Sequence, residues 1–251
     1  MKPEQSIRKI GLARALSKLG YCSRSQATEL IRAGRVRLNG SVRRDPEAPV
    51  RMEHDRVELD GHAVDPQAKV YLMMNKPRGV VTTASDEKGR ATVYDLLDSG
   101  KNREWISPVG RLDKASEGLL LLTNDSKWAA KITDPASHMD KQYHVQVDRV
   151  AGDDLLARLR HGVSVGSDLL RVKEARVLRV GSKNSWLEIT LDEGKNRQIR
   201  RVLEAIGVEV LRLVRVAVGP LELGDLKKGA ARPLTKREKR LVEQALEGER
   251  G

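Results

Sequence analysis

The sequence holds one cysteine, Cys22, no phenylalanine and only 3% aromatic residues. A single cysteine excludes a disulfide framework and a cysteine-based metal site within the chain, and it is typical of a reducing compartment. No apolar run approaches the roughly 20 residues of a membrane span, and the N-terminal residues lack the continuous apolar segment of a signal peptide. These absences predict a soluble, cytoplasmic protein with no membrane partner.

The signatures of common cofactor sites are also absent. There is no phosphate loop of the form G-x-x-x-x-G-K-[ST] and no G-x-G-x-x-G fingerprint after a strand, so a nucleotide cofactor has no evident site. The histidines lack the paired spacing of metal ligands. They are His54, His62, His138, His144 and His161. We therefore expect neither a metal nor a cofactor.

Positive charge is abundant and unevenly distributed. Lys and Arg number 47 against 35 Asp and Glu, and residues 7–44 alone hold ten basic side chains and one acidic one, a net charge of +9. Apolar residues recur at helix-like and strand-like spacings in the same segment, which favours a folded nucleic-acid-binding module over a basic tail. Because aromatic residues are few, a structured RNA is a better partner than a single strand bound by stacking.

Four segments near the N-terminus have the pattern of short helices and strands. We expect helices at 8–18 and 23–34 and strands at 35–38 and 56–59. Ser23 and Gln26 have the spacing of a capping box at the start of the second helix. The pattern predicts a small α/β RNA-binding module over residues 7–62, followed by a linker at 63–69.

The remainder, residues 70–247, reads as a second domain. Strands are expected at 70–74, 119–123, 143–147, 172–180 and 186–191, and helices at 126–132, 153–160, 197–206 and 235–246. Strands and helices do not alternate strictly, which favours a mainly antiparallel mixed sheet with flanking helices. The predicted fold class is therefore α+β.

Asp113 lies on the glycine-flanked loop of the motif Gly110-Arg111-Leu112-Asp113, shortly before the apolar run 119–122. A carboxylate there is either a neutralised partner or a working group. With an ordinary pKa of about 3.9 it stays mostly ionised at pH 7 even if burial raises that pKa by about 2 units. It could then act as a nucleophile or charge stabiliser without an activating base. A structural aspartate that caps a turn or pairs with Arg111 is the alternative.

Two further segments offer groups that suit RNA chemistry. Tyr143 begins an alternating strand, where its ring could lie against a planar base or simply pack in the core. The segment Asn196-Arg197-Gln198-Ile199-Arg200-Arg201 enters a helix, and arginines at a helix start suit phosphate contacts, an ion pair with a buried carboxylate, or plain surface charge.

Taken together, these segments resemble the RsuA-type RNA pseudouridine synthases, which modify bacterial ribosomal RNA. The matching motifs are Asn75-Lys76-Pro77-Arg78-Gly79, Gly110-Arg111-Leu112-Asp113, Lys141-Gln142-Tyr143, Asn196-Arg197-Gln198-Ile199-Arg200-Arg201 and Gly219-Pro220-Leu221. Residues 12–40 resemble the RNA-binding domain first described in the fourth protein of the small ribosomal subunit. Ser116 and Val202 depart from the commoner residues of the family, but neither replaces a reactive group.

The resemblance implies that the chain isomerises a specific uridine of ribosomal RNA to pseudouridine, with the large-subunit 23S RNA favoured. It implies that Asp113 is essential and attacks the base or the sugar or assists departure of the base, that Tyr143 stacks on the uracil, and that Arg200 pairs with Asp113. The residues expected to contact RNA are Arg24, Arg32, Arg35, Lys76, Arg111 and Arg197. A monomer is expected.

Two other functions stay open on the residues alone. The chain could be a non-catalytic protein that binds ribosomal RNA or assists ribosome assembly, for which the N-terminal module would suffice. It could also be a carboxylate-based glycosidase or nucleosidase, a chemistry that usually needs a second carboxylate. Glu117 is near Asp113 in sequence but carries no independent sign of that role.

Overall fold

The computed structural model describes residues 9–83, 86, 88–97 and 105–248. The described chain forms two compact units. The first comprises residues 9–70 with the short segments 105–107 and 123–126, and the second comprises 71–83, 86, 88–97, 108–122 and 127–248.

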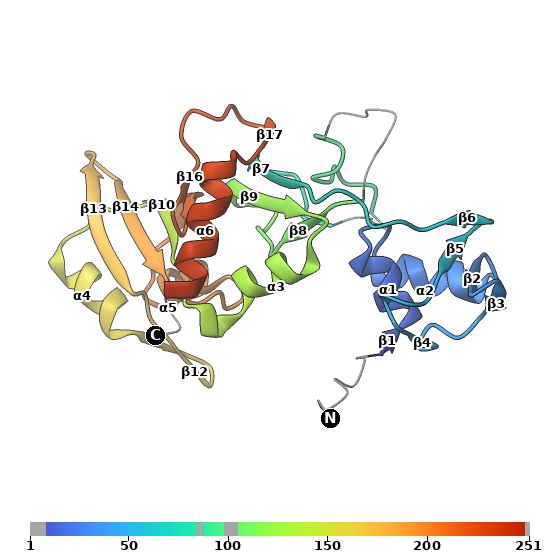
Figure 1. Cartoon of the computed structure of the whole chain (residues 1–251). Helices are drawn as coiled ribbons and strands as arrows, with labels where there is room; N and C mark the ends of the chain where they lie inside the picture. Colours follow the sequence, from blue (N-terminus) through green and yellow to red (C-terminus); the bar gives the residue numbers. More distant parts are fainter. Residues whose placement is uncertain (1–8, 84–85, 87, 98–104, 249–251) are drawn as a thin grey trace, which may run out of the picture. The chain divides into compact units, whose positions relative to one another are not determined.

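The first unit packs two helices on a small antiparallel sheet (Figure 1). The helices are α1 (Leu12–Lys18) and α2 (Arg24–Arg32); the sheet has the order β3 (Ser41–Arg43), β2 (Val36–Leu38), β5 (Val57–Leu59), β6 (His62–Ala63), and β1 (Ile10–Gly11) pairs with β4 (Pro49–Val50). Buried and exposed residues alternate along β2 and β5, so Val36 and Leu38 join the core formed with Leu12, Leu16 and Ile31. Both helices and both strands predicted for this module are present.

Local signals account for the boundaries of these elements. The capping box is formed: Gln26 N–H donates to Ser23 Oγ at 3.1 Å and Ser23 N–H donates to Gln26 Oε1 at 3.0 Å. Residues 63–69, predicted to be a linker, lie within the first unit, where Ala63 ends β6 and Val64 is buried in the core.

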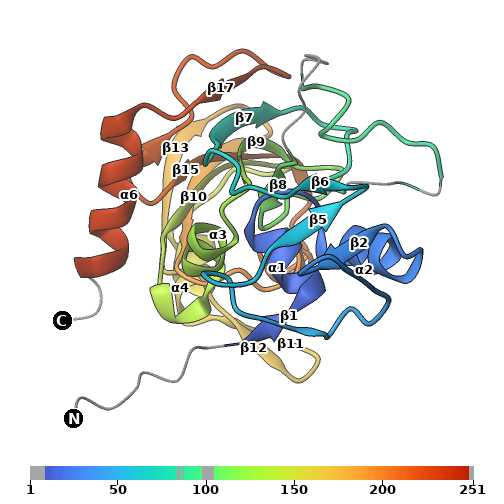
Figure 2. The same cartoon turned by 45° about the vertical axis from the view of Figure 1, so that its right-hand side comes forward.

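The second unit is built on a nine-stranded mixed sheet in the described part of the chain. Its order is β13 (Glu174–Val180), β14 (Ser185–Leu191), β10 (Lys141–Val147), β15 (Val210–Val218), β9 (Glu117–Thr123), β7 (Tyr71–Lys76), β17 (Ala231–Pro233), with β16 (Leu221–Glu222) on β15 and β8 (Ser107–Val109) on β9. The ladders from β13 to β15 are antiparallel, as is β17 on β7 (Figure 2), whereas β15 and β9 run parallel. The α+β class predicted from the sequence is confirmed.

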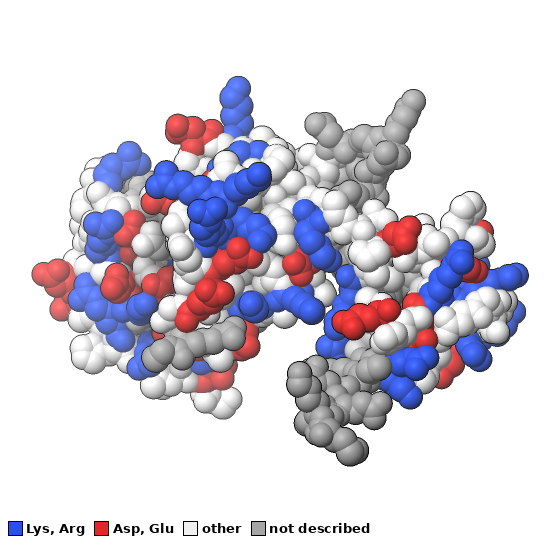
Figure 3. Space-filling view, in the orientation of Figure 1, with Lys and Arg blue, Asp and Glu red and all other residues white. Residues whose placement is uncertain are grey.

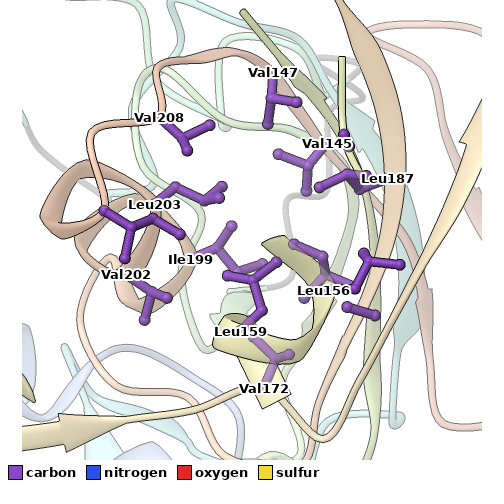
Figure 4. Close-up of a cluster of buried hydrophobic side chains, with 14 of the residues drawn as sticks. Val145, Val147, Leu156, Leu159, Val172, Leu187, Ile199, Val202, Leu203 and Val208 are labelled. Atoms are coloured by element: carbon purple, nitrogen blue, oxygen red, sulfur yellow. The ribbon is translucent and has the colours of Figure 1, made fainter. Parts of the chain in front are cut away.

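Helices cover the sheet over two apolar clusters. Helices α4 (Asp153–His161) and α5 (Gln198–Ala205) cover the first cluster, and α3 (Ser126–Thr133) and α6 (Lys236–Gly248) cover the second. A separate hairpin joins β11 (Val163–Val165) and β12 (Asp168–Leu170), and a short 3-10 turn spans Pro135–Ser137. Figure 4 shows Ile199 and Leu203 of α5 and Leu159 of α4 directed toward Val145 and Leu187 of the strands. The first cluster thereby fixes α5, the helix that carries Arg200, against the sheet.

The central strand β15 was not among the strands predicted from the sequence. Its arginines, Arg212 and Arg215, are three residues apart and so lie on opposite faces of the strand, which breaks a period-two pattern. Arg215 is buried, with its Nε donating to the carbonyl of Leu119 at 2.7 Å. A buried arginine needs such a partner, and the sequence does not display the partner.

Candidate active site

The second unit contains a cleft of about 610 Å³ where the segments singled out in the sequence meet. Asp113, Tyr143 and Arg200, the three predicted catalytic residues, all line it. Arg111 and Arg197, two of the predicted RNA contacts, line it as well. The cleft therefore combines two carboxylates, Asp113 and Glu193, with one aromatic ring and several guanidinium groups.

The loop that carries Asp113 is fixed through its backbone. Thr82 Oγ1 donates to the carbonyl of Leu112 at 2.8 Å, Gly79 N–H donates to the carbonyl of Lys114 at 2.8 Å, and Ser116 N–H donates to the carbonyl of Asp113 at 3.0 Å. The Asp113 carboxylate itself is left facing the cleft. The position of Asp113 is thus set by hydrogen bonds that do not involve its carboxylate oxygens.

Lys76 also restrains this loop, and it is buried although the sequence predicted that it would contact RNA. The side chain is fully buried, and Nζ donates to the carbonyls of Pro77, Asp113 and Ser116 at 3.1, 3.1 and 2.8 Å. Burial lowers the pKa of the ammonium to about 8, while the charges of Asp113 and Glu117 oppose that shift. All three donors are engaged and none reaches the surface, so the predicted RNA contact by Lys76 is incompatible with this position.

Asp113 forms its ion pair with Arg197. Arg197 Nη1 lies 3.5 Å from Asp113 Oδ2, and the two side chains are 46% and 31% exposed. The family resemblance implied that Arg200 would be this partner. Arg200 instead donates from Nη2 to the carbonyl of Ala115 at 3.0 Å, which fastens α5 to the same loop two residues further on.

The electrostatic setting of Arg200 is nevertheless tied to Asp113. Burial and repulsion by Arg197 lower the pKa of the Arg200 guanidinium, the charge of Asp113 raises it, and Arg78 lowers it further. Its Nε is buried and has no hydrogen-bond partner among the described residues. Arg200 is therefore a cation that lines the site with one buried donor left unsatisfied by the described residues.

Tyr143 lies on β10, between Ile189 of β14 and Arg215 of β15. The ladder to β15 is irregular between Gln142 and Tyr143, and such irregularities re-aim the side chains beside them. The half-buried ring packs on the edge of the first apolar cluster and borders the cleft. Arg215, which the sequence analysis did not single out, borders the cleft directly beside it.

Glu117 is not available as a second catalytic carboxylate. Arg212 Nε lies 2.8 Å from Oε1 and Lys228 Nζ lies 2.6 Å from Oε2, and the Glu117 side chain is only 4% exposed. The hydrogen bond from Arg212 lowers the pKa of Glu117 to about 2, against the opposing effect of burial. A carboxylate held in this way is a poor proton donor, so Glu117 does not supply the second carboxylate that a glycosidase needs.

The predicted RNA-binding arginines of the first unit differ in whether their guanidinium groups are already paired with a carboxylate. Arg24 and Arg32, the first and last residues of α2, are exposed and form no ion pair within the described residues. Arg35 is also exposed but pairs with Asp60 at 2.5 Å, a contact that raises the pKa of the guanidinium. Figure 3 shows further basic side chains over the visible face, including a group over α6 of the second unit.

The described residues show neither a metal centre nor a membrane-spanning helix. In the part of the chain that the structure describes, no three His, Cys, Asp or Glu side chains converge as metal ligands. None of the described helices combines the length and apolar character required to cross a membrane.

Comparison with known proteins agrees with this site. The profile of the RNA pseudouridylate synthase family matches residues 70–205, and that of the S4 domain matches residues 10–57. The ribosomal large subunit pseudouridine synthase B of Bacillus subtilis is 38% identical over 90% of this chain and 93% of its own length. An uncharacterised RNA pseudouridine synthase of Aquifex aeolicus is 39% identical over 89% of each chain.

A solved structure extends the similarity to the fold. The crystal structure of a pseudouridylate synthase, 28% identical, superposes with a TM-score of 0.64 over 93% of this chain and 99% of that one. The family profile spans more than half of the chain, and the Bacillus protein matches it almost end to end. The chain therefore belongs to the RNA pseudouridine synthases and carries an S4 domain in its N-terminal part.

Proposed function

We propose that the protein converts one uridine of large-subunit ribosomal RNA to pseudouridine, with Asp113 as the essential group. The observation that carries the proposal is the convergence of Asp113, Tyr143 and the guanidinium groups of Arg197 and Arg200 at one cleft. The choice of large-subunit RNA rests on the Bacillus relative, whose name specifies that subunit.

The reaction is an isomerisation that needs groups of the kinds present. The bond between N1 of uracil and C1′ of ribose breaks, the base turns, and C5 bonds to C1′. C5 loses a proton and N1 gains one, so the overall change is balanced without an oxidant or a co-substrate. An ionised Asp113 would attack the base or the sugar, or stabilise charge as the base departs.

The surrounding side chains would hold the nucleotide. Taking a uridine out of its stack costs a few kcal/mol, and stacking on Tyr143 would recover part of that cost. Arg111 and Arg197, exposed at the cleft, would bind the flanking phosphates, while Arg200 would hold the loop of Asp113. Arg24 and Arg32 would bind phosphates of the structured RNA and leave the chemistry to the second unit.

We also propose the compartment in which the enzyme acts and its oligomeric state. The enzyme would act in the cytoplasm, where ribosomal RNA is assembled, and it would act as a monomer because one cleft contains every group assigned a role in the chemistry.

Mapping the product tests the proposal. Unmodified transcripts of large-subunit and small-subunit ribosomal RNA are incubated with the protein, and pseudouridine is located from the reverse-transcription stops left by a carbodiimide adduct. We expect one modified position, in the large-subunit transcript. Modification of the small-subunit transcript alone would overturn the substrate assignment. Binding to both transcripts without any modification would favour the non-catalytic alternative.

A further inference from the structure

Gln198 is a buried polar side chain to which the proposed mechanism gives no role. It is 2% exposed and lies at the first position of α5, directly after Arg197. Its Nε2 donates to the carbonyl of Arg171 at 2.8 Å and to Glu193 Oε1 at 2.7 Å, and its Oε1 accepts from the N–H of Lys195 at 3.1 Å. One side chain thus joins three separate points around the entrance to α5.

These bonds close a turn whose third residue is Arg197. The N–H of Gln198 donates to the carbonyl of Lys195 at 3.2 Å, so the two residues exchange hydrogen bonds in both directions. Glu193 adds a second link, since its other carboxylate oxygen lies 3.3 Å from Lys195 Nζ. The segment 193–198 is therefore cross-linked to itself and, through Arg171, to the chain entering β13.

Arg197 is held in a conformation that arginine disfavours. Its φ of 50° and ψ of 31° are left-handed, and the third position of a turn with such angles is normally taken by glycine or asparagine. Two of the other described non-glycine residues with positive φ are Asn39 and Asp60, types that tolerate it. An arginine in this position needs support from its surroundings, and the Gln198 bonds are the support that the structure provides.

The same backbone conformation directs the Arg197 side chain to Asp113. The guanidinium reaches the carboxylate at 3.5 Å, while Arg200, one turn further along α5, reaches the carbonyl of Ala115. A right-handed conformation at Arg197 would point its side chain elsewhere. The geometry of the Asp113 ion pair therefore depends on the turn, and the turn depends on Gln198.

We infer that Gln198 is a positioning residue for the isomerisation: it locks the turn 195–198 and so sets the Arg197 guanidinium against the Asp113 carboxylate. Gln198 lines the cleft, but both ends of its amide are engaged within the protein, so its effect is exerted through Arg197. The inference rests on the proposed function, because it assigns a purpose to the placement of Asp113 and Arg197.

A double-mutant cycle on the full-length protein tests the inference. The rate of tritium release from large-subunit transcript labelled at C5 of uracil is measured under single-turnover conditions for Gln198→Met, Arg197→Ala and the double variant. Methionine keeps the length of glutamine but makes none of its three bonds. Because small misplacements at a reacting centre cost one to two decades, we expect each single variant to lose about tenfold in rate.

The double variant separates positioning from general structure. If Gln198 acts through Arg197, the double variant is as slow as Arg197→Ala, within about twofold. Losses that multiply in the double variant would overturn the inference. Gln146→Met is the matched control, since Gln146 is half-buried on β10, donates to Asn184 and does not line the cleft; it should keep the wild-type rate.

A milder change keeps the test decisive if Gln198→Met does not fold. Glu193→Ala removes one acceptor of the Gln198 amide and should lose about threefold in rate, again only when Arg197 is present. An equal loss of rate from Glu193→Ala in the Arg197→Ala background would contradict the inference. A wild-type protein that releases no tritium would instead refute the proposed function, so the two failures are distinguishable.

Discussion

At the scale of single residues, Arg197 combines an unfavourable backbone with a place at the cleft. Asparagine tolerates the left-handed conformation far better than arginine, so Arg197→Asn should leave the free energy of unfolding unchanged or raise it by about 0.5–1 kcal/mol. Loss of the guanidinium should slow the reaction by about tenfold or more. Urea denaturation and tritium release check the two effects separately. A clearly less stable variant would show that the left-handed backbone does not strain Arg197. A variant with full activity would show that the reaction does not need the guanidinium.

Glu117 gives a pH dependence of known sign. Its pKa is about 2 in the folded protein against 4.5 ordinarily, so its ion pairs stabilise the fold above pH 4.5, and that stability disappears as the pH falls toward 2. The full shift corresponds to about 3 kcal/mol. The free energy of unfolding of wild type should exceed that of Glu117→Gln at pH 7, and the difference should shrink progressively below pH 4.5. A difference that stays constant down to pH 2 would show that these ion pairs do not stabilise the fold.

The sequence predicted which residues meet at the cleft better than it predicted how they contact one another. Asp113, Tyr143 and Arg200 lie in ordered motifs, and they do line one cleft, although their roles remain predictions. The burial of Lys76 was not visible from the sequence, because two of its three acceptors are backbone carbonyls at distant positions of the chain. Nor was the choice of Arg197 over Arg200 as the partner of Asp113, which depends on the left-handed turn.

At the scale of elements, the parallel contact of β15 and β9 depends on Gly118. Gly118 pairs with Arg215 and has a φ of +105°, and a Cβ at this position would collide with the Arg215 backbone. Gly118→Ala should therefore destabilise the protein by about 3 kcal/mol, from strain and overpacking together. Gly166→Ala is the control, because Gly166 also has a positive φ but open space around it, and it should cost about 1 kcal/mol. Equal losses in urea denaturation would contradict the close packing of these two strands.

The elements predicted correctly here have boundary signals that lie within a few neighbouring residues. Helix α2 begins at its capping box, and the strands β2 and β5 end at Asn39-Gly40 and Asp60-Gly61, where both residues have positive φ as the turn requires. These signals are contained in a few neighbouring residues. The strand β15 was missed because its alternation is interrupted by Arg215, whose hydrogen-bond partner, the carbonyl of Leu119, is distant in the sequence.

At the scale of the whole molecule, the excess of positive charge gives a test of RNA binding. Replacing Arg24 and Arg32 with alanine should weaken binding to ribosomal RNA and reduce the slope of log K against log salt by roughly 2, because each phosphate contact contributes a little under one unit. Arg51→Ala is the control, since that guanidinium is already paired with Asp55 at 3.0 Å. An unchanged slope in the double variant would remove α2 from the RNA-binding surface.

Family membership follows from the whole chain more securely than from any single motif. The tetrapeptide around Asp113 would suit a structural aspartate equally well, and the basic module alone would suit a protein that only binds RNA. The resemblance drawn from the ordered motifs is confirmed by the family profiles, which match both parts of the chain.

The most direct test of the central claim is tritium release by Asp113→Asn. Large-subunit transcript labelled at C5 of uracil is incubated with wild type and with the variant, and tritium in water is counted, because isomerisation detaches that hydrogen whereas binding does not. Asparagine keeps the shape of the side chain and removes its charge, so RNA binding should persist. We expect release by wild type and release at least ~10³-fold slower by the variant. Release by the variant at the wild-type rate would contradict the role of Asp113.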